Sequence, residues 1–206
     1  MKSTKDKALY IVGTGGFSSE VFIWAKQAGF EIAGFIDDYN NNKTFLNLPI
    51  IEKNKYEKDT KIIIAIGDPQ IRKKVIEQDY QDASFATIIH PSAIIGENVD
   101  IKHGSVICPN VILTSNITIG KHSHLNLGTT IGHDCVIGNY FTAAPQVSIS
   151  GNSIIGECVY FGTSSTLIEK KEICSNITIG AAACVVKDIN KPGIYAGIPA
   201  KLLKNK

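Results

Sequence analysis

The segment ITIGKHSHLNLGTTIGHDCVIG, residues 117–138, contains the pattern that decides the fold. Its large aliphatic residues recur every six positions, at Ile119, Leu125, Ile131 and Ile137. The same register continues from Ile89 to Val185, and all seventeen of its positions are apolar. Because hydrophobic residues make up 44% of the sequence, chance would produce this run about once in a million trials. The period is therefore a structural repeat.

A period of six fits neither an α-helix nor an ordinary half-buried strand, but it fits one flat side of a three-sided parallel coil. Small or β-branched residues stand four positions after most of the aliphatic ones, and glycine often follows the aliphatic one directly, as tight corners require. The repeat predicts a left-handed parallel β-helix of between five and six turns, with strands stacked roughly 4.8 Å apart.

The composition narrows the possible function classes. The net charge is +2 and no basic cluster is interleaved with aromatic residues, which argues against nucleic-acid binding. Residues 1–7 are polar and lysine-rich without an apolar run behind them, so we expect a cytoplasmic protein with no membrane association. The five cysteines have no paired spacing and are expected to be reduced structural thiols.

Residues 1–88 have a different pattern, typical of a small Rossmann-like βαβ domain. An apolar strand runs into Gly13, Gly15 and Gly16, an amphipathic helix follows, and a second strand ends at Asp37 and Asp38. Glycines at such a turn let the backbone approach a phosphate, and an acid after the second strand can accept hydrogen bonds from a ribose or base. The alternative is a tight turn that only packs a helix on a strand, followed by a solvated acidic loop.

A second, smaller βαβ half is expected from a strand at 61–66, Gly67, a helical run and a strand at 84–88. Two complete dinucleotide-binding halves do not fit into 88 residues, so one nucleotide is favoured over NAD. The sequence therefore divides into a nucleotide-binding domain, 1–88, and a β-helix with a C-terminal tail, 89–206.

Positions eighteen apart in the coil lie above one another, and two such columns contain mostly small residues. These columns are Asn126, Ala144, Gly162, Gly180 and Leu127, Pro145, Thr163, Ala181. A smooth strip of small side chains suits a long, thin ligand such as a pantetheine arm. The alternative explanation is that small residues are present only because the tight corners of the coil require them.

A further column places Gly151 directly above His133, and Asp134 follows His133. An imidazole beside a carboxylate has the parts of a general base near neutral pH, and the missing side chain at 151 leaves room for an acyl group. Sequence neighbours on a strand face opposite ways, so contact between His133 and Asp134 depends on the turn. A zinc site using His122, His124 and His133 or His103 is the alternative, and we expect no metal because these positions share no column.

Several segments together resemble bacterial hexapeptide-repeat sugar acetyltransferases. They are the glycine turn with Ile36-Asp37-Asp38, the segment Ile64-Ala65-Ile66-Gly67-Asp68, the run His133-Asp134-Cys135-Val136-Ile137-Gly138 and the ending Ala196-Gly197-Ile198-Pro199-Ala200-Lys201. More narrowly, the chain is similar to the branch that N-acetylates nucleotide-linked 4-amino-6-deoxy sugars, which also includes sialic acid O-acetyltransferases.

The resemblance implies a homotrimer with active sites between subunits, acetyl-CoA as co-substrate and a nucleotide-sugar held by the N-terminal domain. It implies a catalytic base at His133, a supporting acid at Asp134 and an orienting polar group at Asn126. The implied nucleotide-sugar contacts are Gly13, Gly15, Gly16, Asp37, Asp38 and Gly67, and the implied acetyl-CoA path is Thr142, Gly151, Gly162, Thr163, Gly180, Ala181 and Lys201. The chain departs from the family pattern in two ways. Phe17-Ser18 stands where the family often has His-Gly, and Thr142 stands where some relatives have a second histidine.

The function expected from the sequence is therefore transfer of an acetyl group to the C4 amine of a UDP-, dTDP- or GDP-linked amino sugar. The resemblance places this reaction in the biosynthesis of bacterial surface polysaccharide, such as lipopolysaccharide O-antigen. Two alternatives stay open at this point. A sialic acid type of O-acetyltransferase would use a hydroxyl acceptor, and a non-catalytic β-helix scaffold would show no turnover.

Overall fold

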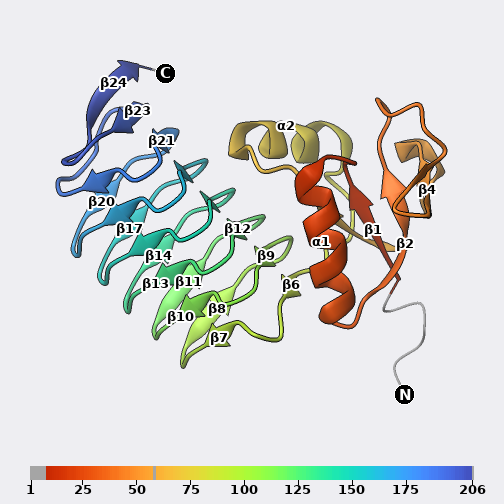
Figure 1. The fold of residues 1–206 in the computed structure, drawn as a ribbon, viewed down its shortest axis with the longest axis horizontal. Helices are drawn as coiled ribbons and strands as arrows, with labels where there is room; N and C mark the ends of the chain where they lie inside the picture. The colour runs from red at the N-terminus through yellow and green to blue at the C-terminus, as the bar shows by residue number, and fades with distance from the viewer. Residues whose placement is uncertain (1–7, 58, 206) are drawn as a thin grey trace.

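The computed structural model describes residues 8–57 and 59–205, which form an α/β domain followed by a coil of short parallel strands (Figure 1). The α/β domain has one five-stranded sheet in the order β3-β4-β2-β1-β5, in which only β3 is antiparallel to its neighbour. Its strands are β1 Ala8–Val12, β2 Glu31–Ile36, β3 Thr44–Phe45, β4 Leu48–Ile51 and β5 Lys61–Ile64. Its helices are α1 Gly16–Gln27, the 3-10 turn η2 Lys53–Lys55 and α2 Pro69–Asp79.

The two helices begin differently, and the difference matters for ligand binding. At α2, Asp68 caps the helix by accepting hydrogen bonds from the backbone N–H groups of Gln70 and Ile71, and Pro69 occupies the first turn. At α1, the cap residue is Gly15, which makes no side-chain cap, and the first turn has no acidic residue. The N-terminus of α1 therefore keeps N–H groups and a partial positive charge available to an anion.

The coil has three faces, named here face 1, face 2 and face 3 in the order in which the chain visits them (Figure 1). Face 1 contains β6 Ile88–Ile89, β9 Val106–Ile107, β12 His124–Leu125, β15 Thr142–Ala143, β18 Tyr160–Phe161 and β21 Ile177–Ile179. Face 2 contains β7 Ile94–Ile95, β10 Ile112–Leu113, β13 Thr130–Ile131, β16 Ser148–Ile149, β19 Thr166–Leu167 and β22 Cys184–Val185. Face 3 contains β8 Val99–Ile101, β11 Ile117–Ile119, β14 Val136–Ile137, β17 Ile154–Ile155 and β20 Glu172–Ile173. The strands β23 Gly193–Ala196 and β24 Lys201–Asn205 extend face 1 as an antiparallel pair.

The repeat of six produces this architecture because one aliphatic residue from each strand points into the prism. Leu125, Ile131 and Ile137, one from each face of a single turn, are at most 1% exposed. Each strand pairs with the strand eighteen residues on, as in the register Leu125 to Ala143. The predicted left-handed parallel β-helix and the α/β N-terminal domain are confirmed.

The corners of the coil need residues that tolerate a positive φ. The corner between faces 2 and 3 has such residues at one-turn intervals, namely Asn98, Asn116, Asp134, Asn152 and Lys170, with φ between 54° and 59°. Asparagine and aspartate enter the left-handed region at lower cost than other non-glycine residues. This corner therefore carries a column of short polar side chains.

The second βαβ half expected from the sequence is only partly correct. Strand β5 and helix α2 form as expected, but the predicted strand at 84–88 is reduced to one parallel bridge between Ile62 and Phe85. Ile88 already belongs to β6, which pairs with β9 of the coil. Two features of this region were not expected, the β3–β4 hairpin and the turn η2. Among residues 8–57 and 59–205, no helix has the length and apolar character needed to cross a membrane.

Candidate functional site

His133 and Asp134 contact each other at the corner between faces 2 and 3. The Nδ1 atom of His133 lies 2.7 Å from Oδ2 of Asp134, and the two side chains are 59% and 46% exposed. The contact is possible between sequence neighbours because Asp134 has a φ of 59°, which turns its side chain back toward the imidazole. A carboxylate accepts at Oδ2, so Nδ1 carries the proton and Nε2 presents a lone pair.

The face of the His133 imidazole lies over Gly151. A Cβ atom placed on Gly151 would lie 2.8 Å from Nε2 and 2.9 Å from Cε1 of His133. The predicted stacking of Gly151 on His133 is therefore present, and the absent side chain is what leaves room for the imidazole.

The small-residue columns lie at another corner of the prism, between faces 1 and 2. Gly162 and Gly180 are required there by close backbone stacking, because a Cβ on Gly162 would lie 2.6 Å from the backbone N of Ala181, and a Cβ on Gly180 would lie 2.9 Å from Cβ of Ala196. Thr163 and Ala181 are exposed at the same corner. One chain therefore does not bring this strip together with His133, since the width of face 2 separates the two corners.

Asn126 also lies at the corner between faces 1 and 2. Its Oδ1 accepts a hydrogen bond of 2.7 Å from the backbone N–H of Leu127. Within one chain it does not contact the His133–Asp134 pair, whose carboxylate is instead bound by Asn116 at 3.0 Å. The sequence signal for Asn116 was its position one turn, eighteen residues, before Asp134.

Thr142 and Lys201, both expected on the acetyl-CoA path, lie in very different surroundings. Thr142 is 6% exposed, and its hydroxyl donates a 2.8 Å hydrogen bond to the carbonyl of Gly67. It belongs to the contact between the two domains because its side chain points outward from face 1, where the α/β domain packs. Lys201 is exposed on β24.

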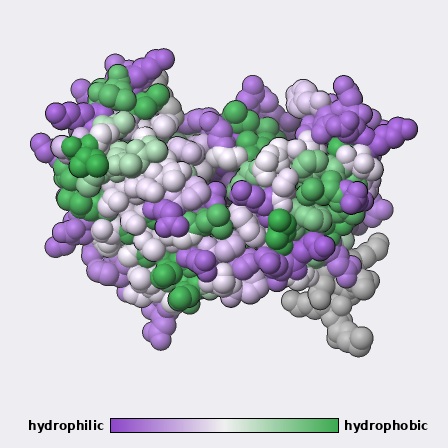
Figure 2. Space-filling view, in the orientation of Figure 1, coloured by the Kyte–Doolittle hydropathy of each residue, from purple (hydrophilic) through white to green (hydrophobic). Residues whose placement is uncertain are grey.

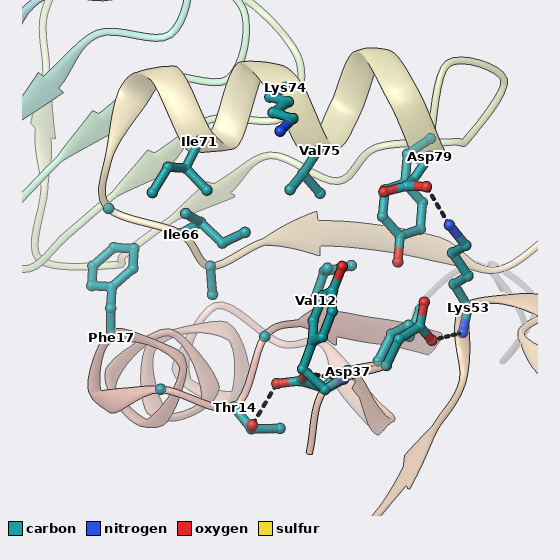
Figure 3. A pocket seen from close by; sticks show the side chains of 18 of the residues that line it. Val12, Thr14, Phe17, Asp37, Lys53, Ile66, Ile71, Lys74, Val75 and Asp79 are labelled. Atoms are coloured by element: carbon teal, nitrogen blue, oxygen red, sulfur yellow. Dashed lines mark hydrogen bonds and ion pairs between the residues drawn. The ribbon is translucent and has the colours of Figure 1, made fainter. Parts of the chain in front are cut away.

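A cavity of about 640 Å³ lies at the carboxyl ends of β1, β2 and β5 (Figure 3). It is lined by all six residues expected to contact the nucleotide-sugar, Gly13, Gly15, Gly16, Asp37, Asp38 and Gly67. The cavity is also lined by five residues that the sequence pattern did not indicate, Thr14, Phe17, Lys53, Lys74 and Tyr80. In Figure 3, Lys74 and Val75 project from α2 toward Val12 on the opposite wall.

Hydrogen bonds hold the polar rim of this cavity in place. Thr14 donates through Oγ1 to Asp37 at 2.6 Å, and Asn40 donates through Nδ2 to Oγ1 of Thr14 at 2.8 Å. Lys53 forms an ion pair with Asp79 and donates its backbone N–H to Asp38. The rim thus combines fixed carboxylates with the ammonium groups of Lys53 and Lys74, near the uncapped N-terminus of α1.

Arg72, the only arginine in the sequence, joins the α/β domain to face 1 of the coil. It is fully buried, and its guanidinium contacts no carboxylate among the described residues. It donates hydrogen bonds to the carbonyls of Ile66, Gly67, His122, Tyr140 and Phe141, to Oγ1 of Thr142 and to Nδ1 of His124. Burial lowers the pKa of Arg72 to about 9, which leaves it cationic at pH 7. Its carbonyl partners include Ile66 and Gly67, so it also fixes one lip of the cavity.

The remaining histidines of the coil do not gather around a metal site. Burial lowers the pKa of His122 to about 3, and His124, also buried, has a pKa well below its ordinary value. Both lie on the side of the prism that faces the α/β domain, whereas His133 lies at the opposite corner. Phe17 packs against His124 with ring centroids 5.2 Å apart. Among residues 8–57 and 59–205, no group of three or more histidine, cysteine, aspartate or glutamate side chains is arranged to hold a metal ion.

Comparison with known proteins agrees with this arrangement. Residues 8–78 match the family model of the PglD N-terminal domain. A GDP-perosamine N-acetyltransferase from Escherichia coli O157:H7 is 29% identical over 148 residues, which cover 71% of this chain and 63% of that protein. The chain thus spans less than two thirds of the length of this curated relative.

Two solved structures have the same fold over nearly their whole length. The acetyltransferase domain of PglB from Neisseria gonorrhoeae FA1090 is 28% identical, with a TM-score of 0.89, and the match covers 96% of this chain and 100% of that chain. That domain has also been solved in complex with acetyl coenzyme A. PerB from Caulobacter crescentus, solved with CoA and GDP-perosamine, is 24% identical, with a TM-score of 0.88, and the match covers 95% and 97% of the two chains. The resemblance to hexapeptide-repeat sugar acetyltransferases is confirmed.

Proposed function

We propose that this protein transfers the acetyl group of acetyl-CoA to the C4 amine of a nucleotide-linked amino-dideoxy sugar. The observation that carries the proposal is the geometry of His133, whose Nδ1 lies 2.7 Å from Asp134 and whose ring lies over the side-chain gap at Gly151. A structural prism has no need for a fixed imidazole with an uncovered basic nitrogen. The E. coli relative and PerB support an amino-sugar acceptor, because one is named for perosamine N-acetylation and the other was solved with GDP-perosamine.

In the proposed reaction, His133 supplies the base. The sugar ammonium is not nucleophilic until it loses a proton, which Nε2 accepts directly or through water. The free amine then attacks the thioester carbonyl, the C–S bond breaks, and coenzyme A leaves as a thiol after taking up a proton. Asp134 stabilises the imidazolium that forms, because its carboxylate lies against the protonated Nδ1. Such a base contributes about 10²–10⁴ to the rate.

The cavity of the α/β domain suits the nucleotide. The uncapped N-terminus of α1 offers N–H groups to a phosphate, and Lys74 offers a cation from the opposite wall. The carboxylates of Asp37 and Asp38 suit the hydroxyl or N–H donors of a ribose or base. UDP, dTDP and GDP all carry the same diphosphate, so only turnover with each nucleotide-linked sugar separates them.

A complete active site on this plan needs a second copy of the chain. The nucleotide cavity adjoins face 1, while His133 lies at the corner between faces 2 and 3, which is the corner opposite face 1. We therefore propose a homotrimer in which His133 of one subunit works beside the small-residue corner and nucleotide cavity of a neighbour. Exposed apolar side chains on faces 2 and 3 support a protein contact there, including Ile112 at 36%, Val136 at 49% and Ile154 at 50% exposure. Figure 2 shows hydrophobic patches on the visible surface of the coil, at the left.

The direct test measures release of free thiol from acetyl-CoA with UDP-, dTDP- and GDP-linked 4-amino sugars. We expect turnover with one nucleotide class and a drop in kcat of at least about a hundredfold in H133A, with little change in KM for the nucleotide-sugar. No thiol release with any 4-amino sugar would refute the proposed acceptor. Acetylation of a hydroxyl acceptor in the same assay would identify the sialic acid O-acetyltransferase activity instead.

A further inference from the structure

A ladder of side-chain amides approaches the His133–Asp134 pair along the corner between faces 2 and 3. Nδ2 of Asn98 donates to Oδ1 of Asn116 at 3.1 Å, and Nδ2 of Asn116 donates to Oδ1 of Asp134 at 3.0 Å. Oδ2 of Asp134 then lies 2.7 Å from Nδ1 of His133. Asn98, Asn116 and Asp134 are spaced eighteen residues, or one turn, apart, so the coil geometry itself aligns their side chains.

We propose that Asn116 is a positioning residue for catalysis, which fixes the rotation of the Asp134 carboxylate so that Oδ2 is held toward Nδ1 of His133. This inference rests on the proposed function. The Asp134 side chain is 46% exposed, so water could solvate its carboxylate in other rotamers. Its two oxygens are instead engaged in different directions, one by the Asn116 amide and one by the imidazole.

The direction of the amides is consistent with this role. A carboxylate accepts hydrogen bonds only, so the group that binds Oδ1 must be a donor, and the Asn116 amide presents its NH₂ group. If Asp134 turned away, the proton on Nδ1 would lose its acceptor, and the neutral imidazole would no longer be held in its position over Gly151.

The alternative role of Asn116 is purely structural, because it occupies a corner with a φ of 54°. Glycine and aspartate both tolerate this backbone conformation, so substitutions can separate the two roles. Asn116→Gly removes the donor without backbone strain. Asn116→Asp keeps the size and the corner preference but places a second carboxylate against Asp134.

The matched control is Asn110, which lies at the corner between faces 1 and 2, one turn before the small-residue strip begins, with a φ of 60° and an exposed side chain. If Asn116 positions Asp134, we expect N116G to lower kcat about five- to twentyfold and N116D to lower it further, because a hydrogen bond to a charged group is replaced first by water and then by repulsion. N110G and N110D should retain the wild-type kcat. KM for both substrates should change by less than about twofold in all four variants.

A second measurement does not depend on turnover. Hydrogen bonds from His133 and Asn116 hold the pKa of Asp134 below its ordinary value. A ¹³C NMR titration of the Asp134 carboxyl carbon should therefore show a higher pKa in N116G than in wild type. The pKa of Asp134 should be the same in N110G and wild type. The inference is overturned if N116D retains the wild-type kcat, if N110G loses as much activity as N116G, or if the Asp134 titration is the same in N116G and wild type. Absence of thiol release by the wild-type protein would refute the proposed function, and the titration would still decide whether Asn116 controls Asp134.

Discussion

Replacing Gly151 with alanine tests the active-site geometry most sharply. The new Cβ would lie 2.8 Å from Nε2, 2.9 Å from Cε1 and 3.1 Å from Cδ2 of His133. Ordinary carbon contacts begin near 3.5 Å, so the imidazole must retreat by roughly 0.5–1 Å. The structure gives it room to do so, because the His133 side chain is 59% exposed.

This geometry predicts a large loss of activity with little loss of stability. The clash falls on the end of an exposed side chain, so we expect the free energy of unfolding to change by less than about 1 kcal/mol. A displacement of about 1 Å at the reacting centre can cost roughly 10²-fold in rate. The expected result for Gly151→Ala is therefore a kcat reduced about a hundredfold with a nearly unchanged Tm.

Thiol release and thermal unfolding measure these two quantities, and the double variant H133A/G151A provides the control. When the imidazole is absent, alanine at 151 has nothing to displace, so the double variant should have the same kcat as H133A alone. A kcat for G151A within threefold of wild type would refute the assignment of Nε2 as the working nitrogen. An additive loss in the double variant would show that Gly151 acts through something other than His133.

Three further predictions concern the surrounding structure. Arg72→Met should lower the free energy of unfolding in urea by about 3–5 kcal/mol, because buried carbonyls lose their hydrogen-bond donor. The control Lys73→Met, at the neighbouring surface position, should lower it by less than about 1 kcal/mol. Equal effects of the two substitutions would contradict the role of Arg72. Lys74→Ala should raise KM for the nucleotide-sugar about tenfold with kcat unchanged, since one charged contact to phosphate is lost, and a change in kcat alone would place Lys74 elsewhere. Sedimentation should give a molecular mass of about 67 kDa, three times the chain mass of 22.3 kDa. The double substitution Val136→Glu and Ile154→Glu should yield inactive monomers. Active monomers would refute a site shared between subunits.

The fold could be predicted from the sequence because the coil is built from short-range rules. A residue six positions on lies on the next face and one eighteen positions on lies directly above, so Leu125 and Ala143 are paired by counting alone. The same counting correctly placed Gly151 over His133. Counting also places Asn116 one turn before Asp134. Asparagine at a corner is usually explained by its positive φ alone, however, so the spacing did not predict a hydrogen bond between the two side chains.

The packing of the α/β domain on the coil could not be predicted in this way. Nothing in the period of six says which face is covered, so Thr142 was expected on the acetyl-CoA path and lies instead between the domains, bound to Gly67. The same limit applies to Lys74, whose direction depends on how α2 lies across the cavity. Arg72 was the one overlooked signal in the composition, because a single arginine among many lysines indicates a site where a planar guanidinium is needed.

The contacts of Arg72 bracket one turn of the coil. Its partners His122 and His124 lie at the start of that turn and Tyr140, Phe141 and Thr142 at its end, while His133 lies between them. Arg72 thus fixes one turn of the coil relative to the α/β domain, and turns outside this one can be added or removed. Adding or deleting a whole eighteen-residue turn beyond Phe161 would shift the C-terminal hairpin by one strand spacing, roughly 4.8 Å, and leave the distance between base and nucleotide cavity unchanged. Removing a turn within residues 122–142 would change that distance. Proteins with this architecture are therefore expected to vary in length only outside this segment.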